Sequence, residues 1–153
     1  MKWEHPHLIK IYEALGALAD NRIEVMENIA KVYSSSGNKF YEVLFNSESN
    51  SIMSNDNGSY WNGELGYPAI AFLLKVGLLK FNPEMADLLK GIKWKDVNQN
   101  FKNDFDKTLI FVNSSIPEVK KQEFFDYVKK LDEAINELDL SFLGEKTIPP
   151  KGY

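Results

Sequence analysis

The sequence lacks cysteine altogether and holds only two histidines in 153 residues. Without cysteine the chain forms no disulfide, no cysteine-ligated zinc site and no iron–sulfur cluster, and it offers no thiol nucleophile. His5 and His7 both fall near the N-terminus, where we expect a solvated start to the first helix. No histidine elsewhere can therefore act as a general base, and the pattern implies neither a metal site nor a cofactor.

Arginine is almost absent as well, because the basic residues are 17 lysines and only Arg22, and the formal net charge is −4. A nucleic-acid surface needs a concentrated basic face, and arginine makes bidentate contacts to phosphate and guanine that lysine does not. Acidic and basic residues are also spread evenly along this chain. Nucleic acid is therefore disfavoured as a partner.

Long hydrophobic runs are missing too. The longest one, from Leu65 to Leu74, is interrupted by Gly66 and Pro68 and is far shorter than the ~20 residues of a membrane-spanning helix. The N-terminal residues MKWEHPHLIK have neither the basic region nor the apolar run of a secretory signal. We therefore expect a cytoplasmic protein with no membrane segment.

The periodicity of the apolar residues predicts an α+β fold. Residues 6–19 repeat apolar side chains at helical spacing, whereas after Arg22 they alternate with polar ones, which predicts an antiparallel meander of three strands and a short fourth at 51–54. Helical spacing then returns, so we expect four helices packed on one face of the sheet. These predicted helices cover residues 68–76, 83–90, 94–112 and 116–138, the last opened by a capping box at Ser115.

One domain and a tail are expected. Residues 1–140 contain no linker or repeat and form a single predicted globular domain, while residues 141–153 include two adjacent prolines and should be extended. The predicted helices 94–112 and 116–138 carry more large apolar residues than a small sheet obviously needs. Packing against each other is the simpler outcome, and self-association is a second hypothesis.

The segment SNDNGSYWNGELGYP, residues 54–68, is the first place to look for a function. It combines aromatic walls with amide and carboxylate groups, the mixture that sites for small polar ligands such as carbohydrates use. Alternatively, its aromatic side chains pack over the sheet edge and its amides satisfy tight turns at Asn57-Gly58 and Asn62-Gly63. The candidate residues are Asn55, Asp56, Asn57, Tyr60, Trp61, Asn62, Glu64 and Tyr67.

One alternative is an enzyme that acts on a small polar substrate. Asp56 and Glu64 would then be its catalytic acid and base. Phosphate binding has little support, since the segment lacks a glycine-rich phosphate motif and no lysine occurs between Lys39 and Lys75.

Calcium binding is a further alternative, in which calcium stabilises the segment. With Gly58 at the sixth position of an EF-hand loop, Asn55, Asn57 and Glu64 occupy the third, fifth and twelfth positions. The first position is Met53, which offers no oxygen ligand, and the segment follows a predicted strand where an EF-hand has a helix.

Residues 31–74 resemble the SWIM-type zinc-finger pattern, with Val32-Tyr33-Ser34-Ser35-Ser36-Gly37 and Tyr41-Glu42-Val43 matching its two strands and 69–74 its apolar helix. Ile52 and Ser54 stand where that family has Cys-x-Cys, and Tyr67 and Ala69 stand where it has Cys-x-His. The resemblance implies a ββα unit in which side-chain packing replaces zinc, and a role in DNA or protein interaction. The scarcity of arginine favours a role in protein interaction over a role in DNA binding.

We therefore predict a non-catalytic binding or protein-interaction domain that uses residues 54–68 as its contact surface. The enzyme with Asp56 and Glu64 and the calcium-stabilised protein remain as alternatives.

Overall fold

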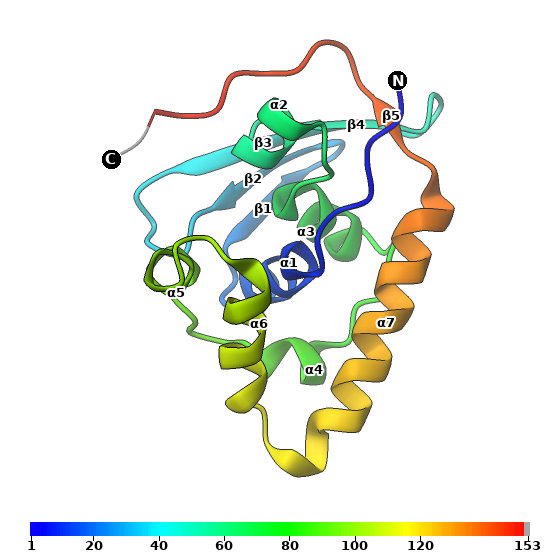
Figure 1. Cartoon of the computed structure of the whole chain (residues 1–153). Coiled ribbons are helices and arrows are strands. Elements are labelled where there is room, and N and C mark those ends of the chain that lie inside the picture. The colour runs from blue at the N-terminus through cyan, green and yellow to red at the C-terminus, as the bar shows by residue number, and fades with distance from the viewer. Residues whose placement is uncertain (152–153) are drawn as a thin grey trace.

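The computed structural model describes residues 1–151 and confirms the α+β class (Figure 1). An N-terminal helix is followed by a mostly antiparallel sheet and then by helices, with one further short strand near the C-terminal end. The helices are α1 (Leu8–Ala19), α2 (Asn57–Asn62), α3 (Tyr67–Lys75), α4 (Pro83–Asp87), α5 (Trp94–Asn100), α6 (Phe105–Ser114) and α7 (Lys121–Leu138). The strands are β1 (Ile23–Met26), β2 (Ile29–Tyr33), β3 (Phe40–Asn46), β4 (Ser51–Ser54) and β5 (Ser141–Phe142).

The sheet has the order β1-β2-β3-β4-β5, and its first four strands form the predicted antiparallel meander. Side chains alternate between its two faces because successive residues of a strand point to opposite sides. Ala30, Val32 and Val43 are completely buried on the inner face, while Lys31 and Glu42 between them are exposed. The alternation of apolar and polar residues along each strand therefore determines which face of the strand is buried.

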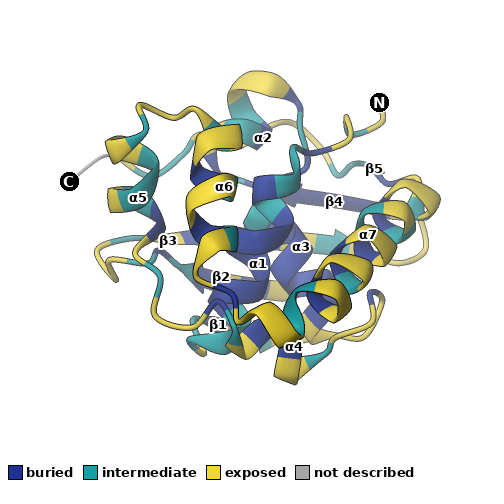
Figure 2. Ribbon diagram, turned by 60° about the horizontal axis from the view of Figure 1, so that its bottom comes forward, coloured by how far each residue is buried: buried dark blue, intermediate teal, exposed yellow. Residues whose placement is uncertain are grey.

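Helices α1 and α3 form the centre of the molecule, between the sheet and the outer helices α4, α6 and α7 (Figures 1 and 2). Helix α3 is buried along nearly its whole length, as predicted. In contrast, α7 buries only a stripe, made by Phe124, Val128, Leu131 and Ile135. The hydroxyl of Tyr12 on α1 donates to Asn113 Oδ1 on α6 at 2.7 Å, and burial raises the pKa of Tyr12 to about 12.

Helix α1 is more deeply buried than its sequence pattern predicts. The helical spacing of its apolar residues predicts one covered face, but Glu13 is 92% buried and so are Ala14 and Ala17. The reason is that helices pack around α1 on several sides, so the face opposite the predicted stripe is covered too.

The sequence prediction was wrong about the local structure of residues 57–62. We expected a tight turn at Asn57-Gly58, but Asp56 accepts a hydrogen bond from Ser59 N and so caps the short helix α2. The helix ends at Gly63, whose φ of 65° is the positive value expected for the glycine after Asn62.

The single helix predicted over 94–112 was also wrong. The chain leaves helical geometry at Lys102 and Asn103, which have φ of 53° and 62°, and Asp104 accepts from Lys107 N to start α6. The capping box predicted at Ser115 does not form either. Ser115 ends α6 instead, and a 3₁₀ turn at Glu118–Lys120 leads into α7.

Residues near the two ends of the chain lie side by side at the edge of the sheet (Figure 1). Strand β5 runs parallel to β4, and Trp3 donates from its backbone to Leu140 O and from Nε1 to Ile52 O at 2.9 Å. The ring of Trp3 packs on Phe142 with centroids 4.1 Å apart. The first two residues of the expected tail are therefore part of the sheet.

Across residues 1–151 no helix is long and apolar enough to cross a membrane. The SWIM resemblance stays a prediction. Ile52, at one of its metal positions, is completely buried, and the described residues contain no group of three or more potential metal-binding side chains.

Candidate functional site

Asp56, the best-connected residue of segment 54–68, is held inside the protein. Its Oδ1 accepts from the hydroxyls of Ser54 and Ser59 at 2.6 and 2.7 Å. Its carboxylate also lies against the backbone of Gly66, where an added Cβ would clash with the carboxyl group. These contacts join the end of β4 to α2 and to the start of α3, so Asp56 organises the connection.

Glu64 and Asn55 also bond to backbone groups. Glu64 Oε1 accepts from His7 N at 2.8 Å, and Asn55 Oδ1 accepts from Glu42 N at 2.8 Å. Asp56 and Glu64 therefore have separate structural partners, and the acid–base pair proposed for an enzyme stays a hypothesis.

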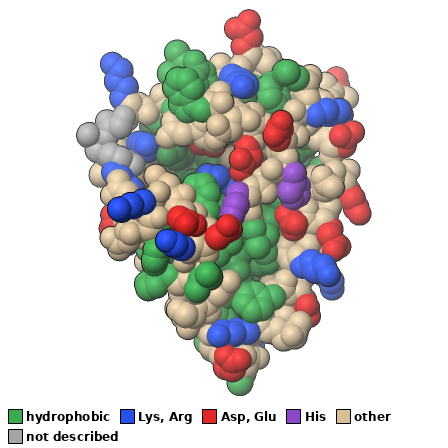
Figure 3. All heavy atoms as spheres, viewed as in Figure 1, with side chains coloured by type: hydrophobic (Ala, Val, Ile, Leu, Met, Phe, Trp, Pro, Cys, Tyr) green, Lys and Arg blue, Asp and Glu red, His purple; other side chains and the backbone are tan. Residues whose placement is uncertain are grey.

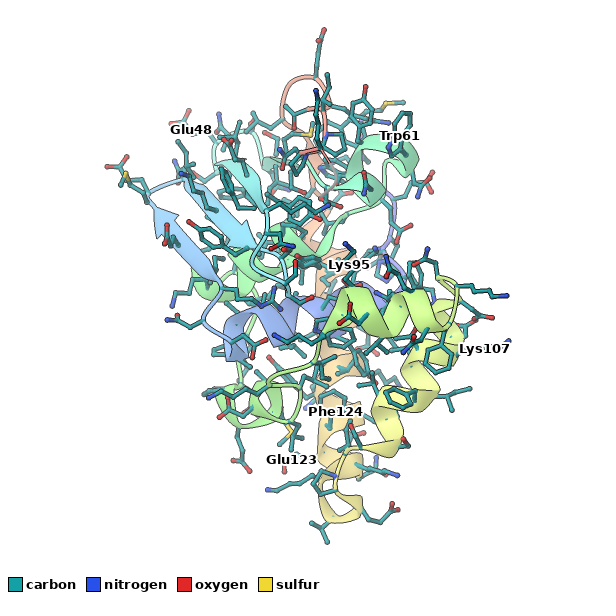
Figure 4. The ribbon with its side chains drawn as sticks, turned by 90° about the vertical axis from the view of Figure 1, so that its left-hand side faces the viewer. Glu48, Trp61, Lys95, Lys107, Glu123 and Phe124 are labelled. Atoms are coloured by element: carbon teal, nitrogen blue, oxygen red, sulfur yellow. The ribbon has the colours of Figure 1, made fainter. Side chains whose placement is uncertain are left out.

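The remaining candidates fall into two groups. Trp61 is 71% exposed, with the half-buried ring of Tyr60 edge-on to it at 4.8 Å, and Asn62 is exposed beside them. Figure 4 shows Trp61 at the periphery of the molecule. Asn57, which is exposed, and the half-buried Tyr67 instead line a cavity.

This cavity, which we name the α1–α5 cavity, has a volume of about 190 Å³. It lies where α1, α5, the start of α3 and the β2–β3 end of the sheet meet, and Figure 4 shows Lys95 of α5 near this meeting point. Ser35 Oγ accepts weakly from Lys95 N at 3.5 Å, which links α5 to the β2–β3 loop. The lining residues are Glu13, Arg22, Ser34, Ser35, Lys39, Tyr41, Asn57, Tyr67, Trp94, Lys95 and Asn98.

Four buried side-chain polar atoms in the part of the chain that the structure describes have no hydrogen-bond partner, and all four belong to residues of this cavity. They are Glu13 Oε1, Arg22 Nη2, Trp94 Nε1 and Asn98 Oδ1. Buried polar groups are almost always bonded, so each exception requires an explanation. Their concentration around one cavity points to a single cause.

Glu13 is the most unusual of these groups, because a carboxylate rarely lies buried without a partner. Burial raises its pKa, and the nearby charge of Lys10 opposes that effect. No ion pair within 4 Å joins Glu13 to any described residue. The protein thus holds an acid in a site where its charged form is disfavoured.

Arg22 follows α1 and directs its guanidinium inward, with only 12% of its side chain exposed. Nη1 donates to Tyr33 O at 2.6 Å and Nε donates weakly to Asp20 Oδ2 at 3.4 Å. These bonds fix the plane of the group and leave Nη2 unused. The one arginine of the chain is therefore an oriented donor in the wall of the cavity.

Aromatic side chains form the apolar part of the wall. Tyr41 and Tyr67 meet edge to face at 5.9 Å, and Trp94 is 97% buried beside them. Burial raises the pKa of Tyr67 well above its ordinary value, so its hydroxyl stays protonated. A few polar groups among aromatic walls are typical of small-ligand sites.

A larger hollow of about 440 Å³ between α7 and the segment before α4 lacks these features. The hydroxyl of Tyr127 there already donates to Lys80 O and accepts from Asn82 N. None of the unpartnered buried atoms belongs to its lining residues. We therefore regard the smaller cavity as the candidate site.

His5 is exposed and His7 is half-buried at the start of α1, and each has an acidic partner that the sequence did not predict. His5 Nε2 pairs with Asp132 Oδ1 at 2.6 Å, and His7 Nε2 pairs with Asp106 Oδ1 at 3.0 Å. Figure 3 shows both in the middle of one face, with acidic side chains beside them. His7 Nδ1 also accepts from Ile9 N and caps α1, so these contacts hold the N-terminal residues to α1, α6 and α7.

Sequence reasoning missed Glu13, Arg22, Trp94 and Asn98. Two signals pointed toward them. The stretch LIKIYEALGALA contains only two charged residues, which is typical of a helix covered on all sides. In addition, a lone arginine among many lysines suggests a position where a planar guanidinium is needed.

Comparison with known proteins places the chain in a family without indicating an activity. A family model described as "Uncharacterised conserved protein UCP014422" matches residues 3–141, which include every residue of the α1–α5 cavity. No curated protein and no solved structure matches the chain.

Proposed function

This chain belongs to the family described by that model, and we propose that it binds a small polar molecule in the α1–α5 cavity without transforming it. The observation that carries the proposal is the set of unpartnered buried atoms on residues of one cavity. A bound molecule that supplies the missing partners would remove the free-energy cost of leaving these groups buried and unbonded.

The size of the cavity limits the class of molecule. A volume of about 190 Å³ corresponds to roughly six water molecules at ~30 Å³ each. It is smaller than the ~300–1,000 Å³ of pockets for drug-sized ligands. The proposed ligand is therefore a small metabolite, and a dinucleotide or other large cofactor is too big.

The composition of the cavity favours binding over catalysis. It contains no cysteine or histidine, and the hydroxyl of Ser34 bonds to that of Ser36 rather than to a base. The activated nucleophile of covalent catalysis needs an adjacent base or a lowered pKa. The buried carboxyl and the fixed guanidinium are suited to recognition.

Thermal unfolding of the full chain in the presence of amino acids, organic acids, sugars and nucleosides tests this proposal. A ligand at 100 times its Kd stabilises the folded state by about 2.7 kcal/mol, which raises Tm by roughly 5–10 °C for a domain of this size. NMR of the recovered compound should show it unchanged.

Two substitutions on α5 provide the matched comparison. Asn98→Leu removes a polar group of the cavity and should abolish the rise in Tm, whereas Asn100→Leu, at an exposed position of the same helix, should preserve it. If no compound shifts the Tm of the natural chain, the cavity holds water only and the proposal fails. An equal response from both variants would exclude this cavity as the binding site.

The exposure of Trp61 supports a second candidate, a protein contact at α2 that uses Tyr60 and Trp61. Large exposed aromatic residues commonly anchor interfaces. Light scattering over a concentration series should then reveal an assembly that the double substitution Tyr60→Ala and Trp61→Ala dissociates. A monomer at all concentrations would remove self-association through this surface.

A further inference from the structure

Glu13 and Arg22 present an acid and a guanidinium to the α1–α5 cavity without forming an ion pair with each other. Arg22 is near enough to lower the pKa of Glu13, although burial, which raises it, has the largest effect. A buried acid without a hydrogen-bonding partner is costly, and Arg22, although it forms an ion pair with Asp20 at 3.4 Å, leaves Nη2 unbonded. The space that separates them therefore suggests an occupant that contacts both.

The unused atoms of these residues require different partners. Glu13 Oε1 and Asn98 Oδ1 accept hydrogen bonds, whereas Arg22 Nη2 donates one. The fourth unpartnered atom, Trp94 Nε1, lies against α1, because a Cβ added to Gly16 would be 2.7 Å from it. We therefore assign Trp94 to the wall and the other three atoms to recognition.

Ligands with one type of charge satisfy only part of this arrangement. A dicarboxylate pairs with Arg22 but offers no hydrogen-bond donor to Glu13 Oε1, and a diamine pairs with Glu13 but faces the cations of Arg22, Lys39 and Lys95. A neutral sugar offers hydrogen bonds to both groups but compensates neither charge. A zwitterion with a cation and an anion close together can meet both, through charge-assisted hydrogen bonds.

We propose that the α1–α5 cavity takes a free α-amino acid, with its carboxylate on Arg22 Nη2 and its ammonium group on Glu13 and Asn98 Oδ1. The aromatic rings of Tyr41 and Tyr67 then form the wall for its side chain. The inference rests on the proposed binding function, and it adds the class of ligand.

Calorimetric titration of the full chain with sets of three matched compounds tests this assignment. One set is L-valine, 3-methylbutanoate, which lacks the ammonium group, and isobutylamine, which lacks the carboxylate; equivalent sets cover the other amino acids. At least one amino acid should bind, and each analogue that lacks one charge should bind at least tenfold more weakly.

Two substitutions assign the charges to their residues. Glu13→Gln should weaken binding of the amino acid at least tenfold without weakening binding of its deaminated analogue, and Arg22→Lys should weaken binding of both. Glu48→Gln removes an exposed acid remote from the cavity and should change neither affinity. Because Arg22 also bonds to Tyr33 O, circular dichroism must confirm that the Arg22→Lys variant is folded. If that variant is unfolded, the comparison of Glu13→Gln with the natural chain still tests the proposal.

The outcomes separate the two proposals. Equal binding of an amino acid and its deaminated analogue, unchanged by Glu13→Gln, would overturn the zwitterion while leaving a binding site for small acids. Binding of sugars or nucleosides without amino acids would also overturn it and keep the proposed function. No binding of any compound, together with an unaltered Tm, would reject both.

Discussion

At the scale of single residues, the unpartnered carboxyl group of Glu13 connects stability with function. Its Oε1 is buried without a hydrogen bond in the same cavity where Arg22 Nη2 and Asn98 Oδ1 are unpartnered. Such groups cost free energy in the unliganded protein, and binding sites commonly retain them at the expense of stability. Removing the charge should therefore stabilise the free protein while weakening the binding proposed here.

The pH dependence of stability gives the first prediction, because burial raises the pKa of Glu13 in the folded state. At pH values between the pKa of Glu13 in the unfolded chain, about 4.3, and its raised pKa in the folded chain, the folded chain binds more protons than the unfolded chain. The contribution of Glu13 to stability is therefore lost as the pH rises through this range. Glu13→Gln should abolish that loss and raise stability at pH 7 by about 1 kcal/mol, or ~2–4 °C in Tm.

Chemical denaturation of both proteins from pH 4 to pH 8 measures this effect. The difference between them should grow as pH rises and should vanish below the unfolded pKa. A constant difference over the whole range would show that the carboxyl of Glu13 does not titrate in the expected way.

The close contact between Gly16 and Trp94 gives the second prediction. Alanine normally stabilises the interior of a helix by ~1 kcal/mol relative to glycine, but here its Cβ would lie 2.7 Å from the rigid indole. Gly16→Ala should therefore destabilise the protein by about 1–3 kcal/mol in urea unfolding, as overpacking usually does. Gly58→Ala, where the nearest atom would be at 3.5 Å, should be neutral or stabilising. Equal effects of the two substitutions would mean that Trp94 moves freely.

At the scale of elements, the interruption between α5 and α6 determines where the cavity wall ends. A continuous helix over 94–112 had the right apolar period, but positive φ at Lys102 and Asn103 reverses the chain and starts a second helix at Asp104. Helix α5 can then lie over the cavity while α6 packs on α1. The signal for the break was the sequence Asn103-Asp104, since asparagine tolerates positive φ and aspartate caps helices.

Glycine substitutions at two lysines test this interruption. A non-glycine residue in left-handed geometry costs roughly 1–2 kcal/mol, and Lys102→Gly removes this cost. Glycine also increases the conformational entropy of the unfolded chain, so the net stabilisation should be up to ~1 kcal/mol. Lys107→Gly, within α6, should destabilise it by ~1 kcal/mol. Urea unfolding measures both effects. Similar destabilisation by both would indicate that 94–112 is one helix in solution.

At the scale of the whole molecule, contacts between residues distant in sequence close the sheet edge. Trp3 contacts Phe142 and donates to Ile52 O, and the pairs His5–Asp132 and His7–Asp106 attach the same N-terminal segment to α7 and α6. The two histidine pairs are partly exposed, and such pairs contribute about 0–1 kcal/mol each. The packing of Trp3 should therefore dominate this closure.

A comparison of two tryptophans tests that conclusion. Trp3→Ala should destabilise the protein by about 2–4 kcal/mol and speed hydrogen exchange at Leu140 to Leu143, because the ring packing and its hydrogen bond are lost. Trp61→Ala removes an equally large but exposed side chain and should change stability by less than ~0.5 kcal/mol. Unchanged exchange in Trp3→Ala would mean that β5 is held by other contacts.

The sequence by itself determined the antiparallel meander, the buried face of its strands and the helices α1 and α3. These features depend on alternation, helical spacing and terminal signals, which act between residues a few positions apart. It also drew attention to Asn57 and Tyr67, two residues of the cavity, through the composition of their segment. The other six candidate residues of that segment contact backbone groups, serine hydroxyls or solvent instead.

Only the tertiary structure decided that Glu13 is buried, that Arg22 turns inward and that α5 covers both. The cavity draws its residues from segments as far apart as Glu13 and Asn98, and no local pattern encodes their meeting. The physical reason is that a helix position is polar or apolar by sequence, whereas its burial depends on which other elements pack over it. A charge in such a position acquires its altered protonation and its unpartnered atoms only when the fold closes around it.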